Sequence, residues 1–216
     1  MLVKTHVAVG VATALLIQPP TTIPTLCTAI AVSSLSGVIC DIDADHSKAK
    51  KGFDKVLMFL FLLGLGLYDL SRYLSFGVEE VVLQNVNIAK PIFALLALLL
   101  ICLYGKMQSH RGFMHSFACC FMITVIINWL NPSLSAYFCI AFLSHITIDL
   151  LNKQGEQLFW PFKWRGSLGF CKSDGIVNKL MLMIGIAGVI YAIYNCPPIQ
   201  EMLASEVFKE TLMHLF

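Results

Sequence analysis

Long apolar segments, separated by short polar or proline-containing breaks, run through most of this sequence. Hydrophobic residues make up 57% of its 216 positions and charged residues only 13%. A soluble domain carries about 25% charged residues, and a helix of about 20 apolar residues is long enough to cross a bilayer. The sequence therefore predicts a polytopic membrane protein that is too short to hold a second sizeable domain.

The breaks predict an all-α membrane bundle of six or seven helices. The first apolar run is short for a span, so we expect it to be tilted, re-entrant or packed inside the bundle. Residues 1–195 are predicted to form the transmembrane domain, and residues 196–216 an amphipathic tail along the membrane surface. The predicted helices cover residues 6–17, 22–40, 56–68, 91–104, 113–130, 133–151 and 176–194.

Lysine and arginine residues are distributed unevenly if the predicted helices cross the membrane in alternation. With the N-terminus in the cytoplasm, only Arg72, Lys90 and Lys209 fall on the outer side, against the other twelve of the 15 basic residues. This excess follows the positive-inside rule and predicts a multi-pass membrane protein with a cytoplasmic N-terminus. The same alternation places His6 and three polar motifs at the cytoplasmic ends of helices.

The first of these motifs is a histidine and a carboxylate inside an apolar run. His145 and Asp149 are four residues apart, so on a helix both side chains leave the same face. Burying an imidazole and an ionised carboxylate at membrane depth is costly. A bound metal ion would offset that cost, and a helix-stabilising His–Asp hydrogen bond is the alternative.

The second motif is Asp41-Ile-Asp-Ala-Asp-His-Ser47, directly after a predicted helix. It is similar to a calcium loop, but His46 stands where an EF-hand needs glycine, and Gly52 where it needs glutamate. Asp41 and Asp43 point the same way if the segment is extended, which favours them over Asp45 as ligands. A solvated loop at a helix end is the alternative.

The third motif is His110-Arg-Gly-Phe-Met-His115-Ser116. Gly112 permits an unusual turn, so His110 on the loop and His115 on the next helix could face one ion. Arg111 suits an anionic substrate oxygen, although ordinary positive-inside placement also explains it.

These residues together provide the ligands of a divalent metal centre, with zinc favoured and manganese or magnesium as alternatives. Such ions lower the pKa of a bound water and polarise an ester or phosphoryl group. For His6 the alternative is an ordinary interfacial histidine. The predicted ligands of one to three ions are His6, Asp41, Asp43, His110, His115, His145 and Asp149.

The combined motifs resemble one known family. Thr5-His6, Asp41-x-Asp43, His110-Arg-Gly-x-x-His115-Ser116 and His145-x-x-x-Asp149, with the aromatic–proline element at residues 159–162, are similar to the bacterial inner-membrane metal-dependent hydrolases of the YdjM-like group. The resemblance implies a hydrolase, and a link to the SOS response because some members are LexA-regulated. A more distant similarity to zinc-dependent phospholipase C and P1-type nucleases implies phosphodiester cleavage. Asp45 and His46 depart from the pattern, and their role stays open.

We therefore expect a metal-dependent hydrolase that cleaves a phosphoester of a phospholipid or lipid-linked substrate at the cytoplasmic membrane face. Asp41 or Asp43 would handle the proton, and Arg111 would stabilise the anionic transition state. The loop at residues 159–165 would form a wall of the site or an aromatic belt. A metal or proton transporter and a regulatory protein with a structural metal remain alternatives, and no nucleic-acid partner is expected. The predicted substrate contacts are Arg111, Ser116, Trp160, Lys163 and Arg165.

Overall fold

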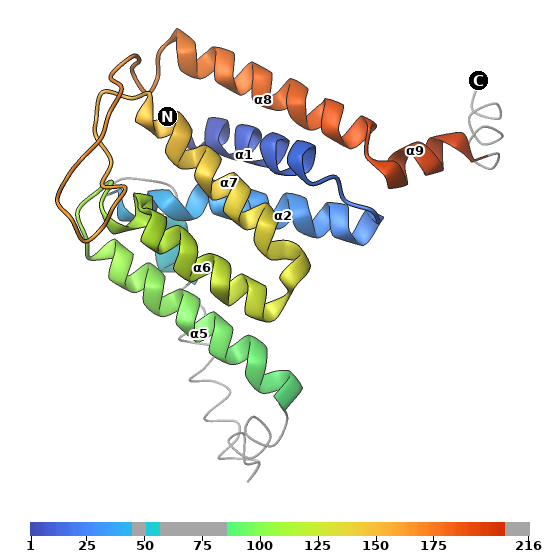
Figure 1. Cartoon of the computed structure of the whole chain (residues 1–216), viewed down its shortest axis with the longest axis horizontal. Coiled ribbons are helices and arrows are strands. Elements are labelled where there is room, and N and C mark those ends of the chain that lie inside the picture. The colour runs from blue at the N-terminus through green and yellow to red at the C-terminus, as the bar shows by residue number, and fades with distance from the viewer. Residues whose placement is uncertain (45–50, 57–85, 206–216) are drawn as a thin grey trace.

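The computed structural model describes residues 1–44, 51–56 and 86–205. The all-α class is confirmed there, and Figure 1 shows long helices lying side by side. Apart from residue 56, the predicted helix over residues 56–68 lies outside the described residues. The α-helices are α1 (Val3–Ile17), α2 (Ile23–Ile39), α5 (Val86–Lys106), α6 (Phe117–Leu130), α7 (Pro132–Leu150), α8 (Ile176–Tyr194) and α9 (Pro197–Ala204).

Local sequence signals set where several helices begin. The hydroxyl of Thr22 accepts the Thr25 N–H at the start of α2, and Asn131 caps α7 by accepting the N–H of Ser133. Each of these helices also carries a proline in its first turn, where no intrahelical N–H partner is needed. The cap and proline together fix the helix start, which is why these boundaries lie close to the predicted ones.

The predicted helix over residues 113–130 is divided in the structure. A short 3₁₀ helix, η2 (Phe113–His115), comes first, and α6 begins only at Phe117. Between them Ser116 is extended and its hydroxyl accepts the N–H of Cys119. The prediction missed this break because the apolar run from Phe113 continues across it, whereas the Ser116 hydroxyl satisfies an otherwise free N–H at the start of α6.

Helix α1 is the centre of the bundle, in contact with α2, α7 and α8. Its neighbours approach closely because they present glycine: a Cβ on Gly37 would lie 3.0 Å from the Val7 backbone, and one on Gly185 would lie 2.9 Å from the Val9 backbone nitrogen. Small residues permit such close packing of membrane helices. Of the expected arrangements for this short first run, the structure shows packing inside the bundle.

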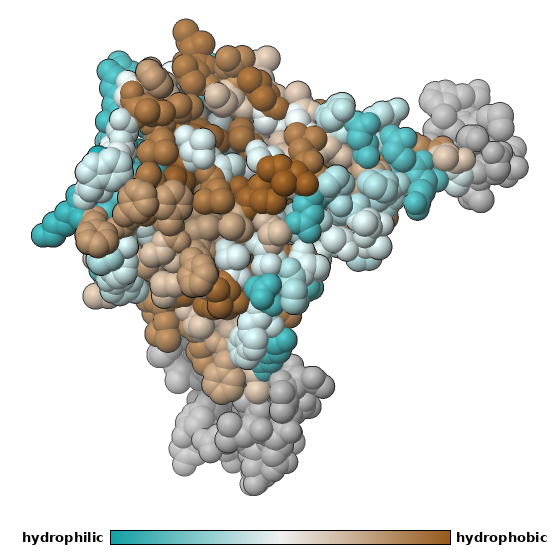
Figure 2. All heavy atoms as spheres, in the orientation of Figure 1, coloured by the Kyte–Doolittle hydropathy of each residue, from teal (hydrophilic) through white to brown (hydrophobic). Residues whose placement is uncertain are grey.

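Four of the described segments are long and apolar enough to cross a membrane. They are Ile23–Asp43, Ala89–Lys106, Pro132–Leu150 and Ile176–Tyr194, while α1 and α6 are shorter apolar helices. In Figure 2, hydrophobic residues cover the body of the bundle and hydrophilic ones gather toward the ends of the helices. This surface matches the hydrocarbon of a bilayer.

One end of the bundle collects the polar motifs. There α1 and α6 begin, α2, α5 and α7 end, and the loop between α7 and α8 crosses over (Figure 1). A second 3₁₀ helix, η1 (Cys40–Asp43), continues α2 at this end and contacts both η2 and α5. The chain thereby brings together residues that are more than 100 positions apart in the sequence.

The close approach of α8 to α1 gives a stability prediction. Gly185→Ala places a methyl group against the backbone of α1, and such overpacking costs about 1–3 kcal/mol. Thermal unfolding of the purified protein in detergent should show a lower midpoint. The matched control is Gly52→Ala, because a Cβ at Gly52 meets nothing within 4 Å. Equal midpoints for the two variants would contradict the packing described here.

Candidate metal centre

Asp149 is the carboxylate on which the buried polar cluster is centred. Its Oδ1 lies 3.1 Å from His6 Nε2, and its Oδ2 lies 3.9 Å from His145 Nε2. The rings of His6 and His145 are stacked, with centroids 3.8 Å apart. A separation of 3.9 Å is too long for a hydrogen bond, so the expected alternative, a His145–Asp149 hydrogen bond within α7, is not formed.

The two 3₁₀ helices bring a third imidazole into this cluster. His115 Nε2 lies 3.9 Å from Asp41 Oδ1 and 3.9 Å from Asp149 Oδ2. Its ring centroid is 5.3 Å from that of His145. The side chain of His115 is fully buried, as are those of His6 and His145.

Asp43 forms hydrogen bonds with His110 and Arg111 and faces His115. Its Oδ1 lies 2.9 Å from His110 Nδ1, while its Oδ2 accepts the Arg111 backbone N–H at 3.0 Å and lies 3.5 Å from His115 Nδ1. A carboxylate at Nδ1 leaves Nε2 of His115 directed at Asp41 and Asp149, which is how carboxylates orient metal-binding histidines. Burial lowers the pKa of His115, but the Asp43 carboxylate, together with the charges of Glu156 and Asp41, more than offsets this and raises it to about 9.

His110 does not take the expected place opposite His115. Its side chain is 42% exposed, and its ring meets that of His115 edge-on at 5.7 Å. The two histidines share the Asp43 carboxylate and do not converge on one point. The reason is the loop conformation, which keeps the His110 ring at the surface.

Arg111 lies in a constrained turn with its guanidinium inside the cluster. Its φ is 60°, a left-handed conformation that costs of order 1–3 kcal/mol outside glycine. Two backbone hydrogen bonds hold it there. The Arg111 N–H donates to Asp43, and the Arg111 carbonyl accepts the N–H of Gln157. The guanidinium donates to Asp149 Oδ2 at 3.0 Å and to the Gln154 carbonyl at 2.7 Å. Gly112 assists by leaving room, because a Cβ there would lie 2.7 Å from the Ser109 carbonyl.

Glu156 belongs to the cluster, and sequence reasoning missed it. It lies in the loop after α7 and is fully buried, and its backbone pairs with Gly166 through hydrogen bonds of 2.8 and 3.0 Å. Burial raises the pKa of its carboxyl to about 8, although the nearby His115 acts to lower it. The available signal was an acidic residue in the loop that directly follows the His145–Asp149 helix.

Asparagine side chains fix the positions of α1 and Asp149. Asn152 donates to Asp149 Oδ1 at 2.7 Å, and the amino group of Met1 contacts the same oxygen. Asn178, at the start of α8, accepts a hydrogen bond from the Thr5 hydroxyl at 2.9 Å, and Thr5 directly precedes His6. These buried amides hold His6 and Asp149 in place from two further elements.

The donor set fits a divalent metal ion. Both nitrogens of His145 and both carboxylate oxygens of Glu156 are buried without a hydrogen-bond partner among the described residues. Unpaired buried polar atoms are costly and call for an explanation, and imidazole with carboxylate is a typical donor set for zinc. Three groups have ligand atoms within 4.8 Å of one another: His6, His145 and Asp149; Asp41, His115 and His145; and His115, Asp149 and Glu156.

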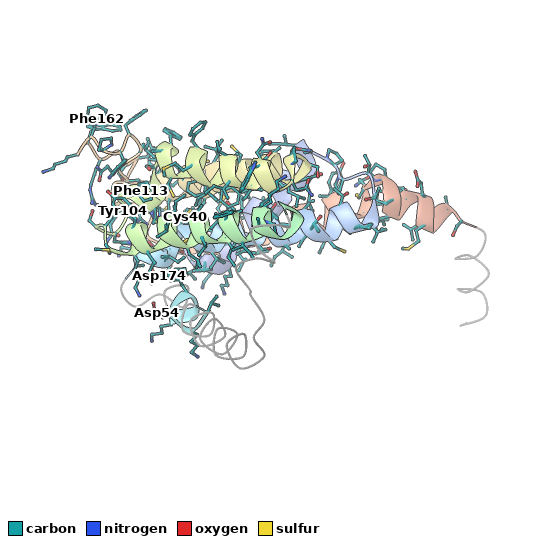
Figure 3. The ribbon with its side chains drawn as sticks, turned by 90° about the horizontal axis from the view of Figure 1, so that it is seen from below. Cys40, Asp54, Tyr104, Phe113, Phe162 and Asp174 are labelled. Atoms are coloured by element: carbon teal, nitrogen blue, oxygen red, sulfur yellow. The ribbon has the colours of Figure 1, made fainter. Side chains whose placement is uncertain are left out.

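Trp160, Lys163 and Arg165, which were expected to contact the substrate, do not all lie in the same place. Trp160 packs edge-on against Phe113 and Tyr104, with centroids 5.1 and 6.0 Å away. Lys163 and Arg165 are exposed on the loop that carries Phe162, whose side chain extends from the ends of the helices (Figure 3). Asp45 and His46 lie outside the described residues.

The geometry separates two histidines that the sequence treated alike. His145→Ala removes a buried nitrogen shared by two of the three ligand groups, so metal affinity should fall by at least about 10–100-fold, the effect of losing even a supporting partner. His110→Ala leaves all three groups intact and should keep the wild-type metal content. Elemental analysis of the purified proteins measures both. Loss of metal in His110→Ala alone would reverse this assignment.

The comparisons with known proteins agree with a membrane location. No curated protein and no solved structure matches this chain. The family described as YdjM inner membrane protein matches residues 1–208. With four helices long and apolar enough to cross a bilayer, the chain is an inner-membrane protein and belongs to the YdjM inner membrane protein family.

Proposed function

We propose that this protein is a metal-dependent hydrolase that cleaves a phosphoester of a phospholipid or lipid-linked substrate at the cytoplasmic membrane face. One observation carries the proposal: three buried imidazoles, three carboxylates and a buried arginine meet at one end of an apolar bundle. Such a set holds cations and meets an anionic group at the same place. Lipid phosphates of one leaflet lie at the depth where membrane helices end.

The metal-binding part of the proposal uses residues from four elements. His6, His145, Asp149 and His115 would hold one to three divalent ions, with Asp41 and Glu156 completing the coordination. A bound ion would supply Lewis acidity toward a phosphoryl oxygen and lower the pKa of water. Asp43 acts as a positioning residue, because its oxygens already face His110, Arg111 and His115.

Arg111 is the residue proposed to bind the phosphoryl oxygens. Its Nε is buried without a hydrogen-bond partner among the described residues, so it has donor capacity left. Guanidinium groups match phosphate oxygens in a planar, two-point geometry. Asp41, whose Oδ1 lies 3.9 Å from His115 Nε2, is the carboxylate proposed to take up the proton.

The position of the cluster supports a hydrolase over a transporter. A transporter needs polar groups near the middle of the membrane and a route to both sides. Among the buried residues that the structure describes, the charged side chains and histidines belong to η1, η2 and their flanking turns, the first turns of α1, the last turns of α7 and the following loop. The opposite ends of these helices show no comparable buried cluster in the described ranges.

The direct test is lipid hydrolysis by the purified protein. Incubation with phospholipid vesicles of the bacterial headgroups should release phosphate or a headgroup, and EDTA should abolish the release because the ligands are emptied. Readdition of zinc or manganese should restore it. His145→Ala should have no activity, and full activity in that variant would sink the proposal.

A second experiment separates phosphate binding from metal binding. Arg111→Gln, assayed at saturating metal because Arg111 also donates to Asp149, should lower kcat by about 10²–10³, the usual cost of removing a donor to a developing anion. Lys172→Gln is the matched control, because Lys172 is an exposed cation in the loop after α7 and is not among the expected substrate contacts. Equal activities of the two variants would remove Arg111 from the mechanism.

A further inference from the structure

An apolar pocket lies beside the candidate metal centre, on the side of the bundle formed by α2 and α5. Its volume is about 470 Å³, within the range of about 300–1,000 Å³ found for small-molecule sites. The walls come from α2, η1, residues 51–56 and α5, and they are aliphatic or aromatic apart from a glycine and a thiol. A pocket of this composition offers nothing to a polar ligand.

Two residues that line the pocket are close in sequence to residues of the candidate metal centre. Ile42, one of its lining residues, stands between Asp41 and Asp43, and Val3 lies one helical turn before His6. From there the walls run inward along α2 to Leu35 and along α5 to Leu95. Seven residues of helix from Leu95 to Cys102 correspond to a depth of about 10 Å. The pocket therefore extends from the polar end into the apolar body of the bundle.

Positive charge lies next to the wall formed by residues 51–56. This helical segment contributes Gly52, Phe53 and Val56 to the pocket, while its lysines Lys51 and Lys55 are exposed. Asp54, labelled in Figure 3, pairs with Lys106 at the end of α5 and so joins the segment to the bundle. Exposed ammonium groups beside an apolar pocket match a molecule with an anionic head and a hydrocarbon tail.

We propose that this pocket binds one acyl chain of an anionic phospholipid. The inference rests on the proposed hydrolase function and names its substrate class: a diacyl lipid, held by its chain so that its phosphate lies near Arg111 and the metal ligands. In a bilayer the pocket walls and the lipid hydrocarbon are equally apolar. The pocket therefore selects a lipid by the fit of its chain and by the charge of its head.

A binding experiment tests the pocket without requiring activity. The protein is reconstituted in nanodiscs with phosphatidylglycerol that carries a diazirine in its acyl chain, and the photolabelled peptides are mapped by mass spectrometry. Peptides that line the pocket should be labelled. Leu95→Trp fills the pocket and should lower the labelling of these peptides severalfold, because the indole occupies the space of the acyl chain. Val56→Trp, on the opposite wall, should do the same.

The chain offers a matched control on the same helix. Leu96 is 50% exposed and Leu95 is 45% exposed, but only Leu95 lines the pocket. Leu96→Trp should therefore leave the labelling unchanged. Equal labelling in all three variants, or an equal loss with Leu95→Trp and Leu96→Trp, would overturn the pocket proposal, because a general lipid-facing surface behaves in that way.

Hydrolysis distinguishes failure of the pocket from failure of the enzyme. Leu95→Trp should lower kcat/KM for long-chain phosphatidylglycerol and leave the cleavage of bis(p-nitrophenyl) phosphate, which has no acyl chain, at the wild-type rate. Cleavage of both substrates with no effect of Leu95→Trp would overturn the pocket and keep the hydrolase. Specific labelling without cleavage of either substrate would keep the lipid site and overturn the hydrolase.

Discussion

The burial of imidazoles and carboxylates together at one end of an apolar bundle is the constraint on which the rest of this structure depends. Each charge removed from water must be balanced by an opposite charge or a metal ion. Asp149 meets this need by facing His6, His145 and Arg111. The 3₁₀ helices η1, directly after α2, and η2, just before α6, serve the same need. They turn Asp41 and His115 toward that centre.

Periodicity and local caps explain how much of the fold could be predicted. Apolar runs ended by proline or asparagine gave most helix boundaries, because those residues act on the backbone next to them. The pairing of His145 with Asp149 followed from helical spacing alone. The gathering of distant motifs at one end was predicted because successive membrane helices run in opposite directions.

The parts that could not be predicted depend on tertiary contacts. Glu156 enters the cluster through a loop pairing with Gly166, and a loop conformation has no periodicity to read. Asp43 and His110 have the residue types of ligands, yet they bind each other at 2.9 Å. Ser116 looked like a site residue and serves as a helix cap. Residue type and spacing indicate which groups gather, whereas the direction of each side chain is decided by packing.

The central place of α1 has a consequence for assembly in the membrane. Its 15 residues are surrounded by α2, α7 and α8, two of which are synthesised more than 100 residues later. Until those helices arrive, Thr5 and His6 lack Asn178 and Asp149 as partners. Helix α1 is therefore fully packed only long after its own synthesis, and biogenesis must shelter it until α7 and α8 close around it.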